Sequence, residues 1–137
     1  MIQLRATRFQ RASTMGLVFV IPLGIVLLLI FGSPAPSMYT KVFFLLFAAF
    51  IAYCYGSLAT ELTIDIENGS LMTSSSLLFK KSIRIADIRW INIRPTNRGF
   101  ITVRAAGAWL SMYRKMPGAI DAMRSIAKSN PAIELKE

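Results

Sequence analysis

The side chains that could carry out acid–base or metal chemistry in this sequence are four central carboxylates, Glu61, Asp65, Glu67 and Asp87. There is no histidine and one cysteine, Cys54, which removes Ser-His-Asp triads and metal sites of the Cys/His type. Three of the carboxylates belong to one alternating segment, where polar side chains ordinarily face water. The sequence contains no phosphate-binding glycine loop and no nucleophile elbow. We therefore expect a protein that is not an enzyme and that uses no cofactor or metal.

Basic and aromatic side chains offer a different chemistry, that of contact surfaces. The chain has 16 Lys and Arg against 7 Asp and Glu, a net charge of +9. Strand alternation that turns Ile91 and Leu110 inward turns the neighbouring aromatic residues outward among arginines. Exposed aromatic residues beside arginine are typical of interfaces with proteins or lipid headgroups. The candidate contact residues are Trp90, Arg94, Arg104, Trp109, Tyr113, Lys80 and Lys81.

Each of these candidates has a plainer interpretation. Basic residues near an anionic membrane are attracted to it by about 1 kcal/mol each, but solvated residues would show the same pattern. A slip of the alternation at a bulge would place the aromatic rings in the core, which a small domain needs to fill. The sequence leaves this choice open for Trp90 and favours the core for Phe100.

Two apolar segments without a charged side chain, Met15–Phe31 and Val42–Ala59, precede the part of the chain that carries most of the charge. At about 1.5 Å per helical residue each covers roughly 25–27 Å, close to the ~30 Å hydrocarbon core of a bilayer. They predict a transmembrane helical hairpin over residues 15–59, with the lipid bilayer as a partner. A cleaved signal peptide is the alternative, but its apolar run is usually about 7–15 residues, and here a second apolar segment follows at once.

Short side chains recur at every fourth position in both apolar segments. Such rows form grooves in which helix backbones approach closely. The two grooves could pack on each other or accept the helix of a partner, and the short connection favours the first arrangement. Pro22 is tolerable in lipid where its lost hydrogen bond is replaced. The predicted helix-packing residues are Gly16, Val20, Gly24, Ala48, Ala52 and Gly56.

The placement of charge predicts the orientation of the hairpin. Residues 1–14 carry Arg5, Arg8 and Arg11 and no acid, whereas the connection between the apolar segments carries only Lys41. The positive-inside rule then makes residues 1–14 a basic cytoplasmic tail. Because two crossings return the chain to its starting side, we expect both termini in the cytoplasm.

After residue 60 the pattern changes from helical to alternating. Asn68-Gly69 predicts a tight hairpin turn between the first two strands, and the register around Ser74–Ser76 stays open. Pro117 suits the start of an amphipathic helix that Asn130-Pro131 ends. The predicted fold class is thus a membrane α-helical hairpin plus a small α+β domain over 60–130, an antiparallel meander of six or seven strands capped by a C-terminal helix at 117–129. Residues 131–137 are expected to be a tail.

This order of elements resembles the bacterial pleckstrin-homology (PH)-like domain, which is often found behind one or two membrane helices. Three pieces carry the resemblance: residues 62–71, residues 82–88 and the helix after Pro117. Ser74-Ser75-Ser76 departs from the pattern, because glycine is expected in that turn. The resemblance covers Glu61–Asn130, about half of the chain. It implies a fold and a membrane-tethered, non-enzymatic role, and it implies no ligand.

These features predict a membrane-anchored PH-like module of the bacterial cytoplasmic (inner) membrane, serving as an accessory or assembly subunit of a larger complex. Its partner would be a membrane protein or a second copy of the chain. One alternative is a module that binds anionic phospholipid headgroups, and another is a regulatory or toxin-like inhibitor of a cytosolic protein. We do not expect nucleic-acid binding, because the sequence has no recognition helix and no RNA-type aromatic-basic motif.

Overall fold

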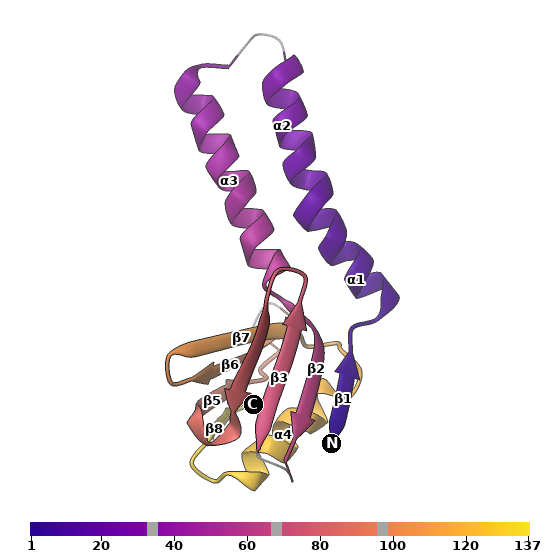
Figure 1. Cartoon of the computed structure of the whole chain (residues 1–137), viewed down its shortest axis with the longest axis vertical. Coiled ribbons are helices and arrows are strands. Elements are labelled where there is room, and N and C mark those ends of the chain that lie inside the picture. The colour runs from indigo at the N-terminus through magenta and orange to yellow at the C-terminus, as the bar shows by residue number, and fades with distance from the viewer. Residues whose placement is uncertain (33–35, 67–69, 96–98) are drawn as a thin grey trace.

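A computed structural model describes residues 1–32, 36–66, 70–95 and 99–137 of the chain. Two long helical segments stand side by side on one end of a sheet domain (Figure 1). The first runs from Arg8 to Phe31 through α1 (Arg8–Met15), the π-helical turn η1 (Gly16–Val20) and α2 (Ile21–Phe31). The second is α3 (Met38–Gly56). Both are long and apolar enough to cross a membrane, with mean hydropathies of 2.8 and 1.6.

Both helical segments begin earlier than the apolar windows of the sequence. Thr7 caps α1 by accepting a hydrogen bond from the Gln10 backbone N–H, and the Gln10 side-chain oxygen accepts one from the Thr7 backbone N–H. Ser37 caps α3 by accepting a hydrogen bond from the Thr40 backbone. These caps satisfy backbone N–H groups that have no partner inside a helix. The helices therefore start at polar capping residues, and α3 ends at Gly56 rather than at residue 59.

Pro22 is accommodated by the π-helical turn that directly precedes α2. The N–H of Ile21 donates to the carbonyl of Gly16, five residues back, instead of to the usual fourth residue. A proline offers no N–H to the preceding turn, and local π geometry is one way for a helix to absorb that loss.

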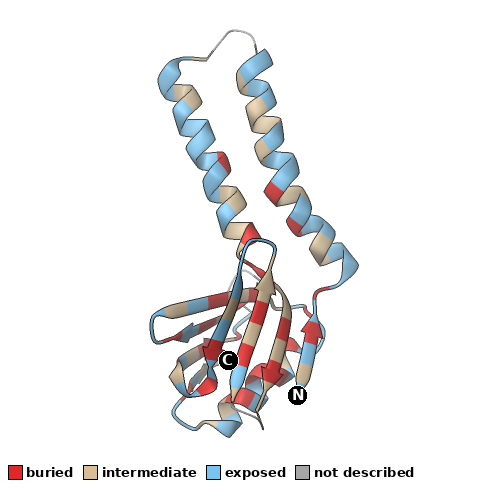
Figure 2. Ribbon diagram, viewed as in Figure 1, coloured by how far each residue is buried: buried red, intermediate tan, exposed pale blue. Residues whose placement is uncertain are grey.

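The hairpin contributes little to the molecular core. Its residues are mostly exposed, and the buried ones within the two helical segments are Thr14, Val18, Ala48 and Gly56 (Figure 2). A buried helix of a globular protein is apolar because its neighbours cover it, whereas these apolar helices are uncovered. The exposed apolar faces are suited to lipid or to other helices.

The sheet domain has eight strands in the described part of the chain, in the order β4-β3-β2-β7-β6-β5-β8, with β1 also pairing with β2. Pairings β2–β7 and β5–β8 are parallel, so the sheet is mixed rather than the predicted antiparallel meander. The expected Asn68-Gly69 turn lies outside the described residues. The strands are β1 (Ile2–Arg5), β2 (Ala59–Asp65), β3 (Leu71–Ser76), β4 (Lys80–Arg84), β5 (Ile88–Asn92), β6 (Phe100–Ala105), β7 (Ala108–Tyr113) and β8 (Glu134–Lys136).

Strand β1 corrects the expectation of an N-terminal tail. It pairs antiparallel with β2 from Ile2↔Ile64 to Arg5↔Glu61, and Leu4 is buried in the core. A four-residue strand with two apolar positions has almost no sequence signal of its own, because the partner strand supplies most of its stability. The residues before and after the hairpin therefore belong to one sheet.

The core of the domain lies between the sheet and α4 (Ala119–Ser129). Alternate strand residues such as Leu62, Ile91 and Met112 are fully buried, and Met123 and Ile126 of α4 pack against them. The helix begins two residues later than predicted, because Gly118 adopts φ 74 before it and Pro117 stays outside. The predicted amphipathic C-terminal helix is otherwise confirmed.

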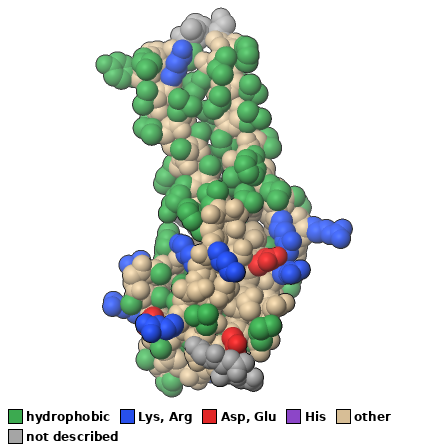
Figure 3. All heavy atoms as spheres, viewed as in Figure 1, with side chains coloured by type: hydrophobic (Ala, Val, Ile, Leu, Met, Phe, Trp, Pro, Cys, Tyr) green, Lys and Arg blue, Asp and Glu red, His purple; other side chains and the backbone are tan. Residues whose placement is uncertain are grey.

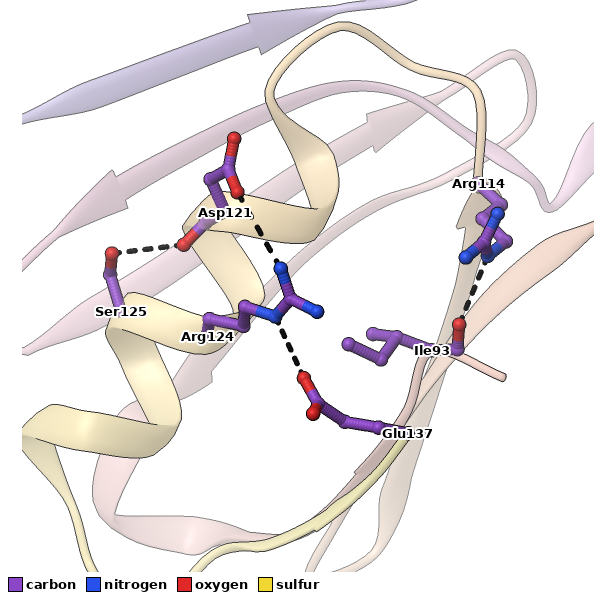
Figure 4. Close-up of polar contacts among 6 residues, drawn as sticks. All are labelled: Ile93, Arg114, Asp121, Arg124, Ser125 and Glu137. Carbon is purple, nitrogen blue, oxygen red and sulfur yellow. Dashed lines mark hydrogen bonds and ion pairs between the residues drawn. The ribbon is translucent and has the colours of Figure 1, made fainter. Parts of the chain in front are cut away.

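The expected tail at 131–137 instead contains β8, which pairs with β5 and ties α4 to the sheet. Arg124 of α4 donates from Nε to Oε1 of Glu137 at 2.7 Å and lies 4.0 Å from Asp121 (Figure 4). This hydrogen bond and the negative charge of Glu137 raise the pKa of Arg124. Arg114 meanwhile donates to the backbone carbonyl of Ile93 at 3.0 Å (Figure 4).

Candidate functional site: the helix-proximal surface of the sheet domain

The turn between β3 and β4 lies directly against the end of α3. The backbone N–H of Leu78 donates to the carbonyl of Gly56, the last residue of α3, at 3.2 Å. The ring of Phe79 meets the ring of Tyr53 edge-on, with centroids 5.9 Å apart. Leu77, Leu78 and Phe79 nevertheless remain at least one third exposed. Three consecutive apolar residues are thus presented at the level where the hairpin joins the domain.

Hydrogen bonds hold this turn in a defined shape. Ser76 donates from its backbone N–H to the Phe79 carbonyl at 2.8 Å, and the Phe79 N–H donates to the Ser76 hydroxyl at 2.9 Å. The register Ser74↔Lys81 and Ser75↔Lys80 brings the two strands to the turn without a slip. The register that the sequence left open around Ser74–Ser76 is therefore regular between β3 and β4, with the turn formed by residues 77–79. On the other side of β3 the register with β2 shifts by one residue between Ala59↔Ser76 and Glu61↔Ser75.

A cleft of about 230 Å³ opens beside this turn, between the last residues of α3 and one face of β6 and β7. Trp109 lines it and is 57% exposed, the most exposed aromatic side chain of the sheet domain among the described residues. Lys81 lies at the same cleft, where its Nζ donates to the Trp109 carbonyl at 3.5 Å and lies 5.9 Å from the Phe79 ring centroid. The cleft combines aromatic walls, hydroxyl groups and one cation.

We call this region the helix-proximal surface. Figure 3 shows apolar side chains covering the hairpin, and Lys and Arg side chains gathering where the hairpin meets the sheet domain. Among the described residues between Arg11 and Lys80, Lys41 at the far end of the hairpin is the single cation. The helix-proximal surface consists of Leu77, Leu78, Phe79, Lys80, Lys81 and Trp109.

The predicted alternation in β5, β6 and β7 is confirmed. Ile91, Val103, Leu110 and Met112 are buried, and Trp109 points to the opposite face. Phe100 corrects our expectation of a core position, because it lies half-buried on the outer face. Its ring packs on Tyr113 at 5.6 Å between centroids, so a neighbouring ring covers it in place of the core.

Tyr113 joins the domain to the first helix. Its hydroxyl lies 2.7 Å from the hydroxyl of Thr14, which is buried and also donates to the Gln10 carbonyl. Arg11 of the same helix pairs with Glu61 of β2 at 3.5 Å. The base of the hairpin therefore contacts the sheet through a hydrogen bond and an ion pair, in addition to being covalently continuous with it.

The remaining candidates lie further from the lysines. Arg104 is exposed and is the cross-strand partner of both Trp90 and Trp109, so these three residues form one row on the outer face of the sheet. At the far end of the row Trp90 lies beside β8, with Lys136 Nζ 5.0 Å from its ring centroid. Arg94 donates to the Glu137 carbonyl at 3.2 Å, at the same edge of the sheet. The row therefore runs along one face from the helix-proximal surface to the edge formed by β5 and β8.

The predicted helix-packing residues are placed unevenly. Ala48 is buried and Ala52 half-buried, whereas Val20 is 68% exposed. A Cβ at Gly16 or Gly24 would meet no other atom within 4 Å, so neither glycine is a close contact within the single chain. Gly56 is a close contact, but with Leu78 of the sheet domain rather than with the first helix. Packing on a partner helix stays a prediction.

Two of the central carboxylates, Glu61 and Asp87, form separate ion pairs. Glu61 pairs with Arg5 and Arg11, and Asp87 accepts from Arg84 Nε at 2.9 Å. Glu67 lies outside the described residues. Within the residues the structure describes, no group of three or more His, Cys, Asp and Glu side chains is placed to hold a metal ion.

Leu77, Leu78 and Phe79 are not among the contact residues that the sequence predicts. In the sequence they are an apolar run between Ser74–Ser76 and Lys80-Lys81, a pattern that favours the start of a strand over a surface turn. No protein-family model, curated protein or solved structure matches this chain.

Gly56→Ala is expected to destabilise the contact between α3 and the turn, because the new Cβ would lie 2.5 Å from Leu78 Cδ1 and 2.7 Å from its Cγ. Leu78 must shift, and because its side chain is 47% exposed we expect a cost at the low end of the range for overpacking, about 1 kcal/mol. Gly24→Ala is the matched control, since its Cβ meets nothing and alanine favours helix. Denaturant unfolding of the full chain in detergent, followed by tryptophan fluorescence, compares the two variants. Equal unfolding midpoints would contradict the close contact at Gly56.

Proposed function

We propose that this protein is a membrane-anchored, non-enzymatic module in which the helical hairpin holds a PH-like sheet domain against a bacterial inner membrane. In this proposal it acts as an accessory or assembly subunit, and a membrane-protein partner contacts the helix-proximal surface. The observation that carries the proposal is the exposed Trp109 beside an open cleft at the base of two uncovered apolar helices. Exposed tryptophan at the rim of a cleft is typical of residues that concentrate binding energy.

The pairing of β1 with β2 supports the proposed topology. Residues before the first helix and after the second lie in one sheet, so a hairpin that spans a bilayer would leave and return on the same side. Cleavage near residues 33–35, as for a signal peptide, would remove β1 and take Leu4 out of the core. A retained anchor keeps the sheet complete.

The subunit proposal is tested by purifying tagged full chain in mild detergent. Trp109→Ala is expected to lower the yield of a stoichiometric membrane partner at least about tenfold, because loss of a hot-spot residue costs roughly 2 kcal/mol or more. Leu71→Ala is the matched control, since Leu71 is exposed at the other end of β3. A partner retained equally by both variants would contradict binding at the helix-proximal surface.

A second candidate function is binding of anionic phospholipid headgroups. The observation that favours it is the sequence of the β3–β4 turn, in which exposed Leu77–Phe79 is followed directly by Lys80 and Lys81. Apolar residues flanked by lysine are typical of surfaces that sit at the boundary between acyl chains and headgroups. The two functions are compatible, because different parts of one surface can meet lipid and protein.

The proposed orientation places both termini in the cytoplasm and residue 37 outside. A cysteine introduced as Ser37→Cys in a Cys54→Ala background is expected to react with a membrane-impermeant thiol reagent in whole cells. Ser125 is exposed on the outer face of α4, and a cysteine introduced as Ser125→Cys is expected to react only after the membrane is opened. Reaction at position 125 but not at position 37 in intact cells would reverse the orientation.

A further inference from the structure

We infer that the helix-proximal surface rests in the headgroup layer of an anionic bilayer, with Leu77, Leu78 and Phe79 toward the acyl chains and Lys80 and Lys81 toward lipid phosphates. This inference rests on the proposed membrane anchoring. It adds the depth at which the domain sits and the class of lipid that it contacts.

The first argument for this depth comes from α3. Its 19 residues span about 28 Å, close to the ~30 Å hydrocarbon core, so its last turn reaches the boundary with the headgroups. Leu78 is hydrogen-bonded to the last residue of that turn, and Phe79 packs on Tyr53 within it. The β3–β4 turn must therefore share the depth of the helix end.

The first helical segment gives the same depth independently. Its 24 residues span about 36 Å, more than the hydrocarbon core, so one end must extend beyond it. The polar residues of that segment, including Arg8, Gln10 and Arg11, are all at the end that contacts the sheet domain. Thr14 is bonded to Tyr113 of β7 at the point where the polar part ends. The sheet domain therefore begins where the apolar part of this helix begins.

The chemistry of the surface fits this level of a bilayer. Tyr53 and Trp109 line the cleft, and tyrosine and tryptophan concentrate at membrane interfaces because their rings are apolar and their polar atoms can reach water. Leu77, Leu78 and Phe79 would lose contact with water there, at a turn in which Ser76 already bonds the backbone N–H and carbonyl of Phe79 and Gly56 accepts from the Leu78 N–H. Lys80 and Lys81 would meet the phosphate layer, where anionic lipid attracts each nearby cation.

The experiment measures depth directly with nitroxide labels on full-length protein in lipid nanodiscs. Single cysteines are introduced as Leu77→Cys, Leu71→Cys and Leu45→Cys in a Cys54→Ala background. Leu77 and Leu71 are 36% and 38% exposed at opposite ends of β3, and Leu45 is exposed midway along α3. Collision of each label with oxygen, which concentrates in acyl chains, is compared with collision with a water-soluble nickel chelate.

The expected result is that the labels at positions 45 and 77 collide mainly with oxygen and that the label at 71 collides mainly with nickel. Nickel access at 77 equal to that at 71, with 45 still lipid-exposed, would overturn the inference while leaving the anchor intact. Nickel access at 45 would overturn the anchor itself and the inference with it. Shielding of 77 from both reagents would overturn the lipid contact in favour of a second copy covering the turn.

The class of lipid is tested with the same label at position 77. Nanodiscs of phosphatidylcholine alone are compared with nanodiscs that also contain phosphatidylglycerol. Nickel access is expected to fall severalfold when the anionic lipid is present, and the paired change Lys80→Gln with Lys81→Gln is expected to abolish the difference. The pair Lys128→Gln with Lys136→Gln, on α4 and β8, is the matched control. Equal access in the two lipids, or equal effects of the two pairs, would overturn the assignment to anionic lipid.

Discussion

Leu4→Asp is expected to unfold the sheet domain, although the helical hairpin separates Leu4 from the rest of the domain in sequence. Leu4 is buried beside Leu62 of β2, and its Cδ2 lies 3.2 Å from the position of a Cβ at Gly118. Removing a buried leucine side chain costs about 2–5 kcal/mol, and burying an unpaired carboxylate adds to that loss. A domain with a stability of roughly 5–15 kcal/mol has little margin against such a change.

Gln3→Asp is the matched control, since Gln3 is exposed on the opposite face of the same strand. Near-ultraviolet circular dichroism and limited proteolysis of the full chain in detergent separate the two outcomes. We expect the Gln3 variant to keep its signal and its resistance, and the Leu4 variant to lose both. If both variants stay folded, β1 contributes nothing to the core and residues 1–14 act as the tail that the sequence predicted.

Strong local periodicity explains which elements the sequence predicted well. The alternation around Ile101 and Val103 and the helical spacing of Met123 and Ile126 set their own burial, and the structure places all four in the core. The two apolar segments are predicted for a similar reason, since an uncharged run of that length has few other uses. The starts of the two helices differ from the predicted ones, because the caps at Thr7 and Ser37 lie outside the apolar runs.

The elements that the sequence did not predict depend on distant partners. Strands β1 and β8 have four and three residues, too few for alternation to be distinguished from chance. Each is stabilised by pairing across the fold, β1 with β2 and β8 with β5. The pairing between β2 and β7 is parallel, and it too joins segments that no local sequence pattern relates. The sequence alone therefore predicts a sheet that lacks β1 and β8.

Only the part of the candidate site that depends on one strand was predicted from the sequence. Trp109 follows from the alternation of β7, and its outward position is confirmed. Leu78 and Phe79 of the same surface come from another hairpin, and they meet α3 through the hydrogen bond from Leu78 to Gly56 and the contact between Phe79 and Tyr53. Trp90 lies in the same outer row through Arg104, but its ring also meets Lys136 of β8, a strand that the sequence did not predict. The sheet face on which a side chain lies can be predicted from its own strand. The residues that it meets there belong to distant segments and cannot be predicted in this way.

Met112→Ala is expected to cost about 2–5 kcal/mol of stability, whereas Trp109→Ala should leave the domain folded. Both residues lie on β7, three positions apart and on opposite faces, with Met112 fully buried and Trp109 mostly exposed. The cavity left by Met112 would lie among side chains that are already close-packed, so its neighbours could not fill it without strain. Truncation at Trp109 mainly exposes a surface that solvent or a partner already meets.

Denaturant unfolding of the full chain in detergent measures the two variants together, with circular dichroism as the signal because Trp109 is itself a fluorophore. The full chain is required, because a fragment that starts at residue 60 would lack β1 and its contribution to the core. A large loss of stability for Trp109→Ala would mean that the ring packs inside the domain and that the helix-proximal surface has no aromatic anchor. A small loss for Met112→Ala would mean that the two faces of β7 are reversed. The expected separation, a stable Trp109 variant that binds its partner or membrane less well, would identify a side chain retained for contact rather than for folding.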